Sequence, residues 1–418
     1  MLLKKTIFIL LAFFFINYAA QAKDLHYAGF FLQSYENLDK ELPYTSKAFH
    51  PDLDNKNYSR ISNFFESIVD QAKNPNYSIS KSMGTISKGD ALAFGVALTS
   101  ENIDIIDSGR SKNIQIQLRF NIICFDFVDK VLLYNVPIKQ TISKAITDLP
   151  SESNIVEIIL EYLFKDGDQS NSAELFKELN QGGEELASLF NSRNVTEGRS
   201  LRNTILSEIE KIPENFQRLR VGIDQIIIDD AAKKTFPKGF DYQLYKFALA
   251  QRFESALSKN DIALIPYSAG GINDREIGLI SKFKDAPNIN HEKLKLPEPD
   301  KVFILNVDKI ISNEKKLEDN YRLRKVVASK YTFKFIEPYG NELLFDSSFY
   351  TSRTFRYGKN QKHLYENENL LMIYRILESY LFFQFSDLLI NPNEDKIKEI
   401  SKDANADMLK KLYMEITQ

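Results

Sequence analysis

The stretch "KNIQIQLRFNIICFDFVDKVLLYNVPIKQTI" at residues 112–142 alternates apolar and polar side chains. The apolar set of its first half is Ile114, Ile116, Leu118, Phe120, Ile122 and Cys124. The polar set is Asn113, Gln115, Gln117, Arg119 and Asn121. A period of two predicts β-strands with one dry and one wet face, here two strands joined by a short turn. A membrane pore and a helix-backed sheet can both carry this pattern, so the rest of the chain has to decide between them.

Amphipathic helices lie between such alternating stretches. In "SRISNFFESIVDQAK" at 59–73, apolar residues recur every three or four positions, at Ile61, Phe64, Phe65, Ile68, Val69 and Ala72. A helix with one apolar stripe covers the dry side of a sheet. A membrane-spanning barrel instead needs many alternating strands of about ten residues and no such helices. The sequence therefore predicts an α+β fold, an α/β sandwich in which mostly antiparallel sheets are backed by helices.

The two halves of the chain repeat one order of elements: strand, helix, strand, strand, long hairpin, helix. Both first helices also carry Phe-Glu-Ser, at 65–67 and 253–255. This repetition predicts two duplicated domains. Four residue pairs are then expected at equivalent places: Phe65/Phe253, Val96/Leu305, Cys124/Phe335 and Tyr162/Tyr380.

The predicted organisation has five parts. They are a signal peptide at 1–22, a first α/β domain at 23–165, a helical connector at 166–217, a second α/β domain at 218–392 and a C-terminal helical tail at 393–418. The tail carries an apolar stripe suited to docking: Ile397, Ile400, Leu409, Leu412 and Ile416.

The second half differs from the first mainly by an insertion at 268–298. It carries an amphipathic patch made of Ile277, Leu279, Ile280 and Phe283. Two interpretations stay open for this segment. It covers the sheet with a helix, or it is a specialised site that binds a partner.

The chain begins with a pattern typical of an export signal. Lys4 and Lys5 precede an apolar run of about 13 residues, shorter than the roughly 20 that a spanning helix needs. The run ends in Ala20-Gln21-Ala22, a small-x-small pattern that signal peptidase cleaves. We expect a soluble exported protein, periplasmic or secreted, with no integral membrane span in the mature chain.

Composition limits the partners. Removal of residues 1–22 takes away two lysines and moves the formal charge from −3 to −5. A mildly acidic chain in which acidic and basic residues are intermixed lacks the basic patch typical of nucleic-acid binding. Cys124 is the only cysteine, so no intramolecular disulfide forms, and its place on the apolar face indicates a core residue rather than a nucleophile.

The second half resembles a group of envelope domains in the segments "RLRVGIDQIIID", "FALAQRFESALSKNDIALIPYS", "DKVFILNVDKI" and "YTFKFIEPYGNELLFDSSFYTS". The group comprises the amino-terminal domain of TolB, the curli secretion channel lipoproteins and the lipoprotein activators of penicillin-binding proteins. Two similar domains occur in the flagellar H-ring protein of some bacteria. The resemblance covers most of 218–352 and, more faintly, 26–142, and it implies a binding or assembly module of the cell envelope without chemistry of its own.

No motif assigns catalytic, cofactor-binding or metal-binding residues. The four histidines, His26, His50, His291 and His363, lie far apart and form no metal-ligand spacing. "DGDQSNSAELFK" from Asp166 begins like a calcium loop but has Asn171 and Lys177 where Gly and Glu are needed.

Three further motifs are equally weak. "SISK" at 78–81 lacks the companion motifs of a serine acyltransferase. Gly182-Gly183 and Gly270-Gly271 lack the surroundings of a phosphate loop. Asp229-Asp230 follows a strand and reads as a solvated pair or a helix cap.

The sequence therefore favours an exported cell-envelope binding or assembly protein without catalytic activity or cofactor. Its expected partner is an envelope protein or a peptidoglycan-associated molecule, and self-association is open. Two alternatives are a secreted hydrolase with a site assembled from scattered residues and a secreted factor that acts on a host.

Overall fold

The computed structural model describes residues 23–34, 37–50, 56–81, 92–107, 112–146, 149–164, 201–216, 219–268, 275–281, 290–317, 322–340, 342–359, 362 and 366–417. The expected signal peptide, the calcium-like loop from Asp166 and both glycine pairs lie outside these residues. We call the described residues up to 216 the first unit and those from 219 the second unit.

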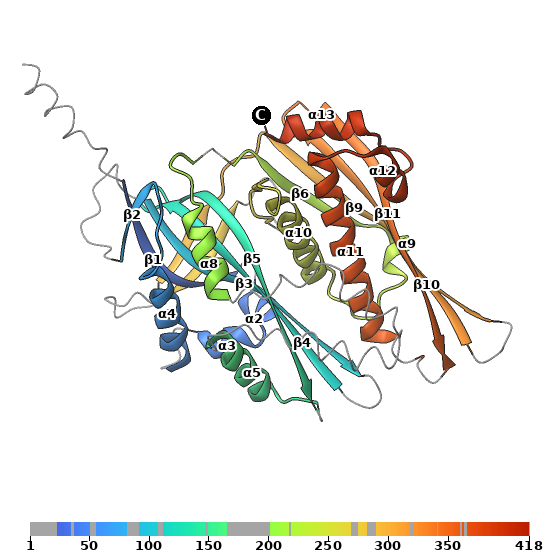
Figure 1. Cartoon of the computed structure of the whole chain (residues 1–418), viewed down its shortest axis with the longest axis horizontal. Helices are drawn as coiled ribbons and strands as arrows, with labels where there is room; N and C mark the ends of the chain where they lie inside the picture. Colours follow the sequence, from blue (N-terminus) through green and yellow to red (C-terminus); the bar gives the residue numbers. More distant parts are fainter. Residues whose placement is uncertain are drawn as a thin grey trace, which may run out of the picture.

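The first unit is a sheet with helices on one face (Figure 1). Its strands are β1 (Lys23–Ser34), β2 (Tyr77–Ser80), β3 (Leu92–Asp107), β4 (Lys112–Asp126) and β5 (Val131–Ile146), in the order β2-β1-β3-β4-β5. Its helices are α2 (Leu38–Glu41), α3 (Thr45–Phe49), α4 (Lys56–Val69), α5 (Glu152–Phe164) and α8 (Leu201–Glu210). The apolar set of the quoted stretch is fully buried beneath these helices, because the dry face of a sheet needs such a cover.

The second unit is a longer sheet covered by longer helices. Its strands are β6 (Val221–Ile228), β9 (Lys301–Lys316), β10 (Arg322–Glu337) and β11 (Glu342–Gly358), in the order β11-β10-β9-β6. Its helices are α9 (Asp230–Lys233), α10 (Tyr242–Ser258), α11 (Asn367–Ile390), α12 (Glu394–Ile400) and α13 (Ala406–Thr417). Together the two units confirm the predicted α+β class.

Strand order and register agree between the units. The order β1-β3-β4-β5 matches β6-β9-β10-β11, with the first pair parallel and the others antiparallel in both. Each ladder also contains a bulge at the same place. The three matched bulges lie at Tyr27/Gly29 and Ile223/Gln225, at Leu98/Ser100 and Lys330/Tyr331, and at Cys124/Phe125 and Phe335/Ile336. A bulge inserts one residue and is kept as a feature of a fold, so three matched bulges favour duplication over chance similarity.

The expected residue pairs follow this register in the sheets. Cys124 pairs with Phe94 two residues before Val96, and Phe335 pairs with Phe303 two residues before Leu305. Phe65 on α4 and Phe253 on α10 are both fully buried. The last pair differs, because Tyr162 is half-buried on α5 whereas Tyr380 is 38% exposed on α11. In the first unit α8 packs beside α4, while α11 packs beside α10.

Four layers follow one another through the molecule (Figure 1). The first-unit helices cover one face of the first sheet, and α10 and α11 of the second unit contact its other face, at β5 and β3. The second sheet lies on the far side of α10 and α11. The order is therefore helices, sheet, helices, sheet, and α10 is buried all round because it lies between two sheets.

The described residues of the insertion at 268–298 do not form the covering helix of the first interpretation. Its described part is a β-hairpin, β7 (Glu276–Ser281) and β8 (Asn290–Lys295). β7 pairs with β1 and β8 pairs with β5, so the hairpin brings the first sheet to seven strands and closes β1, β3, β4 and β5 into a ring. Ile277, Leu279 and Leu294 are buried, because the apolar residues follow a period of two rather than a helical one. Phe283 lies outside the described residues.

The C-terminal tail packs on the second unit. Its apolar stripe is buried at Ile397, Ile400, Leu409 and Leu412, with Ile416 partly buried. Ser401 forms a bridge to Phe349 and covers part of the edge of β11. No helix in the described part of the chain is both long enough and apolar enough to cross a bilayer.

Candidate functional site

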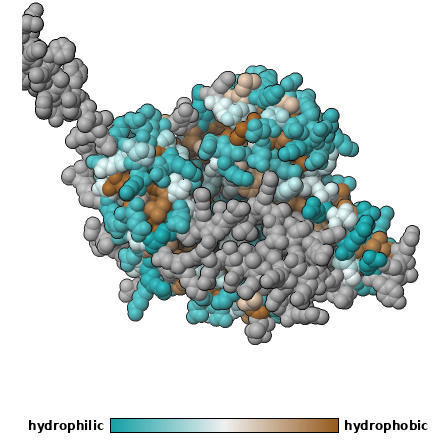
Figure 2. Space-filling view, viewed as in Figure 1, coloured by the Kyte–Doolittle hydropathy of each residue, from teal (hydrophilic) through white to brown (hydrophobic). Residues whose placement is uncertain are grey.

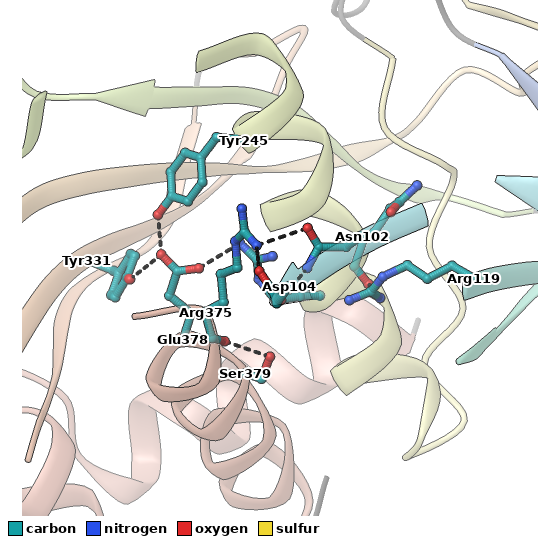
Figure 3. Close-up of polar contacts among 10 residues, drawn as sticks. Asn102, Asp104, Arg119, Tyr245, Tyr331, Arg375, Glu378 and Ser379 are labelled. Carbon is teal, nitrogen blue, oxygen red and sulfur yellow. Dashed lines mark hydrogen bonds and ion pairs between the residues drawn. The ribbon is translucent and has the colours of Figure 1, made fainter. Parts of the chain in front are cut away.

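The densest polar cluster lies in the second unit, among α10, α11 and β10, and reaches the first unit through Arg375 (Figure 3). At its centre is Glu378 on α11, which is 0% exposed. Its carboxylate accepts hydrogen bonds from Tyr331 Oη at 2.8 Å, from Arg252 Nη2 at 2.6 Å and from Tyr245 Oη. Burial, and then the charge of Glu378, raises the pKa of both tyrosines. Both phenols therefore stay protonated at neutral pH and donate to the carboxylate.

Arg375, one turn before Glu378, joins α11 to the first sheet (Figure 3). Its Nη1 donates to Asp104 Oδ1 at 2.6 Å and to Asn102 Oδ1 at 2.9 Å, both on β3. Asn102 in turn donates to Asp104 Oδ2 at 3.0 Å. This charge-assisted group ties the second unit to the first.

Arg119 on β4 makes the second link between the units. Its Nη1 donates to the backbone oxygen of Gln251 at 3.1 Å and to Ser255 Oγ at 2.9 Å, both on α10. Ser100 on β3 donates to Gln251 Oε1 at 2.6 Å. Burial, and then the nearby guanidinium of Arg252, lowers the pKa of Arg119 to about 9. Arg119 therefore stays charged at neutral pH.

The wet face predicted for the quoted stretch is consequently dry over part of its length. Arg119 is 7% exposed and Asn121 is 4% exposed, whereas Gln115 and Gln117 are half-buried. The expectation of a solvated face is wrong at Arg119 and Asn121, because the second unit covers this part of the sheet. On this face of β4 the polar side chain of Arg119 bonds α10 of the second unit instead of water.

Two groups of the same interface have pKa values near neutrality. Burial, and then repulsion from Arg119 and Arg252, lowers the pKa of the half-buried Lys139 to about 7. Burial raises the pKa of Glu254 to about 7. The hydrogen bond that its Oε1 accepts from the backbone nitrogen of Tyr267 at 2.9 Å lowers this pKa, but by less than burial raises it. Glu254 is 4% exposed.

Replacement of Glu254 by Gln should remove a pH dependence of stability. The folded pKa of Glu254, about 7, lies above its usual 4.5, so its contribution to stability is present below pH 4.5 and is lost as the pH rises through 7. Relative to Glu254→Gln, the wild type should lose about 1–3 kcal/mol of unfolding free energy over this range. Gln keeps an acceptor for Tyr267, and urea unfolding at several pH values measures the difference. Parallel pH profiles would contradict the raised pKa.

Most donors and acceptors of this cluster bond one another. The bonds of Glu378 hold α10, α11 and β10 of the second unit together, whereas those of Arg375 and Arg119 lock the second unit to the first. Buried polar networks of this kind fix one arrangement when their members are paired. The sequence analysis did not identify these residues. A usable signal was present, because Arg252, Glu254 and Glu378 interrupt helices that are otherwise apolar.

A second candidate site is the face of the second sheet that points away from α10 and α11. We call it the open sheet face and define it by its outward polar residues and Ile227: Gln225, Ile227, Asn306, Lys309, Lys315, Arg324, Lys330, Thr332, Lys334, Asp346, Ser348, Tyr350, Ser352 and Arg356. It holds six basic side chains interleaved with hydroxyl groups and with the apolar side chains of Ile304, Ile311, Val326, Ala328 and Ile336. Lys330 lies 3.5 Å from Asp308 and Lys334 lies 3.6 Å from Asp346, loose pairs that leave the face predominantly basic.

The residues considered for chemistry are not brought together. His26 lies on β1, His50 ends α3 and His291 lies on β8, while His363 is outside the described residues. Among the described residues, no group of three His, Cys, Asp or Glu side chains could hold a metal ion. Cys124 is fully buried, and burial raises the pKa of its thiol, as expected for a core residue.

The remaining motifs have ordinary structural roles. Ser78 and Ser80 lie on β2, and Lys81 pairs with Asp70. Asp229 accepts a hydrogen bond from Asn306, and Asp230 pairs with Lys233. A shallow groove of about 520 Å³ lies between the end of α4 and β2, lined by Val69, Asp70, Ala72, Lys73, Asn74, Tyr77, Ile79 and Lys81. It contains no pair of side chains placed for acid–base work.

Comparison with known proteins gives no family. No family model matches the chain, and no curated protein sequence matches it. Among solved structures, a minor lipoprotein from Acinetobacter baumannii is similar over 44% of this chain and 98% of its own, with 12% identity and a TM-score of 0.22. A putative neuraminyllactose-binding hemagglutinin homolog from Helicobacter pylori covers 34% of this chain and 80% of its own, with 12% identity and a TM-score of 0.18. Superpositions this poor carry no inference about function.

Proposed function

We propose that the chain is an exported binding or assembly protein of the cell envelope that acts without catalysis. One observation carries this proposal: Arg119 and Arg375 lock the two units together, while a basic sheet face is left uncovered by the residues that the structure describes. In Figure 2, the part of the second unit that faces the viewer is mainly hydrophilic with small apolar patches. The open sheet face is therefore the surface that we assign to a partner.

Export is supported by the residues that precede Lys23. The charged start and the short apolar run of residues 1–22 are typical of a cleaved signal. Cleavage after Ala22 would leave Lys23, the first described residue, which pairs with Tyr77 on β2, at the start of the mature chain.

One experiment tests export and binding together. Protein purified from the periplasmic or secreted fraction should have the intact mass of a chain that begins at Lys23. A photo-crosslinker in place of Ser352, exposed on β11, should form adducts with another envelope molecule in cells. The same crosslinker at Lys410, exposed on α13, is the control and should form few. Retention of residues 1–22, or equal adducts at both positions, would argue against the proposal.

A further inference from the structure

Within one molecule, helices of the second unit pack on the sheet of the first unit. The two outer surfaces of the molecule make no contact of this kind among the described residues. On the first sheet, the face away from α4 receives α10 and α11 of the second unit. On the second sheet, the corresponding face is the open sheet face. Because the sheets share strand order and bulges, each position on one face has a counterpart on the other.

Equivalent residues of the two sheets occupy the same position in their strands but differ in solvent exposure. Arg119 and Lys330 each lie beside the second matched bulge, paired with Ser100 and Lys309 respectively. Arg119 is 7% exposed because it bonds α10, whereas the Lys330 side chain is 52% exposed. The second sheet therefore presents to solvent a position that the first sheet buries against helices.

The helices show the complementary difference. Alignment of Phe65 with Phe253 places Asn63 of α4 opposite Gln251 of α10. Gln251 is 8% exposed because it contacts the first sheet, whereas Asn63 is exposed. α10 is buried all round, but α4 keeps a polar outer side. One end of the molecule thus offers a helix layer, and the other end offers a sheet face.

Charge favours contact between these two unlike surfaces. The open sheet face carries Lys309, Lys315, Arg324, Lys330, Lys334 and Arg356. On the helix layer, α5 contains three exposed glutamates, Glu152, Glu157 and Glu161, and no basic residue, whereas α4 carries the exposed Lys56 and Arg60. Lys47 and Lys144 each lie 3.0 Å from one of these glutamates, as exposed pairs that a stronger partner can replace. Two open sheet faces would repel each other, whereas the open sheet face and α5 attract.

We propose that the open sheet face of one molecule binds the helix layer (α4 and α5) of a second copy of this chain. This inference rests on the proposed function and names the partner of the open sheet face. The contact joins two different surfaces, so it is heterologous: each molecule keeps one free surface of each kind. Repetition of the contact extends the order of helices and sheets from one molecule into the next.

Complementation between two variants tests the proposal. Lys309→Glu with Lys330→Glu damages the sheet face, and Asn63→Arg with Glu157→Lys damages the helix layer. Each double variant alone should be monomeric by sedimentation velocity, with an apparent dissociation constant raised about tenfold or more. A mixture of the two should form a dimer, because each still carries one intact surface. Unchanged melting temperatures show that both variants fold, and Lys410→Glu on α13 is the matched control that should assemble like the wild type.

The outcomes separate this inference from the proposed function. Assembly of the wild type, its loss in each variant and its return as a dimer in the mixture would support a head-to-tail contact. A wild type that stays monomeric at all concentrations would overturn it, as would variants that fail to complement. If the monomer binds anionic phospholipid vesicles through Lys309 and Lys330, the partner is an anionic surface instead. A monomer that still forms crosslinks to another molecule at Ser352 would leave the proposed function standing.

Discussion

Glu378→Leu should lower the free energy of unfolding by about 3–5 kcal/mol, the range for removal of one partner from a buried ion pair. The carboxylate is 0% exposed, and three donors from two other elements converge on it: Tyr245, Arg252 and Tyr331. With Leu in its place, the guanidinium of Arg252 loses its counter-charge at 6% side-chain exposure. Urea denaturation at neutral pH, followed by circular dichroism, measures the loss.

A matched control separates this effect from the loss of any glutamate. Glu399 is exposed on α12, and its replacement by Leu should change stability by about 0.5 kcal/mol or less. Glu378→Gln gives a second comparison, because the amide keeps an acceptor for the tyrosines but no charge for Arg252. We expect its loss to lie between those of the other two variants. Equal stability of Glu378→Leu and Glu399→Leu would mean that Glu378 is not the centre of the polar network in the second unit.

The sequence predicts the sheets and helices well because each obeys a simple period. Ile114 to Cys124 alternate over one strand, and Ile61 to Ala72 recur every three or four residues over α4. Both patterns depend only on which side of a strand or helix is buried. Packing within one unit decides that side. The matched bulges could not be predicted, since a bulge leaves no reliable mark in the order of side chains.

The arrangement of the units could not be predicted from the same patterns. Arg119 reads as a solvated residue because its own unit leaves that face open, and only the position of α10 buries it. The hairpin at 276–295 reads as a helical patch because Ile277, Leu279 and Ile280 fit either period over so short a run. Its partner strand, β1, lies about 250 residues earlier in the chain, and no local signal carries that distance.

The candidate sites, too, could be predicted only where the signal is local in the sequence. The sequence indicated that no motif assigns a catalytic centre, because the spacing of histidines and glycines can be read directly. It did not indicate the polar network around Glu378, because the bonds of Glu378 run to residues 126 and 133 positions away along the chain. The open sheet face could not be predicted from the sequence either, because its exposure depends on which layer of helices or strands lies at the end of the molecule.

Phe253→Ala should cost about 3–5 kcal/mol of unfolding free energy, the range for truncation of a buried aromatic residue. The side chain is 0% exposed on α10, and its ring meets aromatic rings from the sheet and from α11. The ring centroids lie 5.1 Å from Phe303, 5.5 Å from Phe333 and 5.3 Å from Phe382, in tilted or edge-on pairs that add to the burial. Truncation leaves a cavity that the rigid sheet fills poorly.

The control for this prediction is Gln117→Ala, in the quoted stretch. Gln117 is half-buried on the outer face of β4, and its truncation should cost about 0.5 kcal/mol or less. Phe65→Ala, at the equivalent place in the first unit, should cost as much as Phe253→Ala, because Phe65 is also fully buried and stacks on Phe30 at 5.2 Å. Denaturant unfolding of the three variants measures these differences. Equal losses at Phe253 and Gln117 would contradict the assignment of faces, and a small loss at Phe65 alone would contradict the equivalence of the two units.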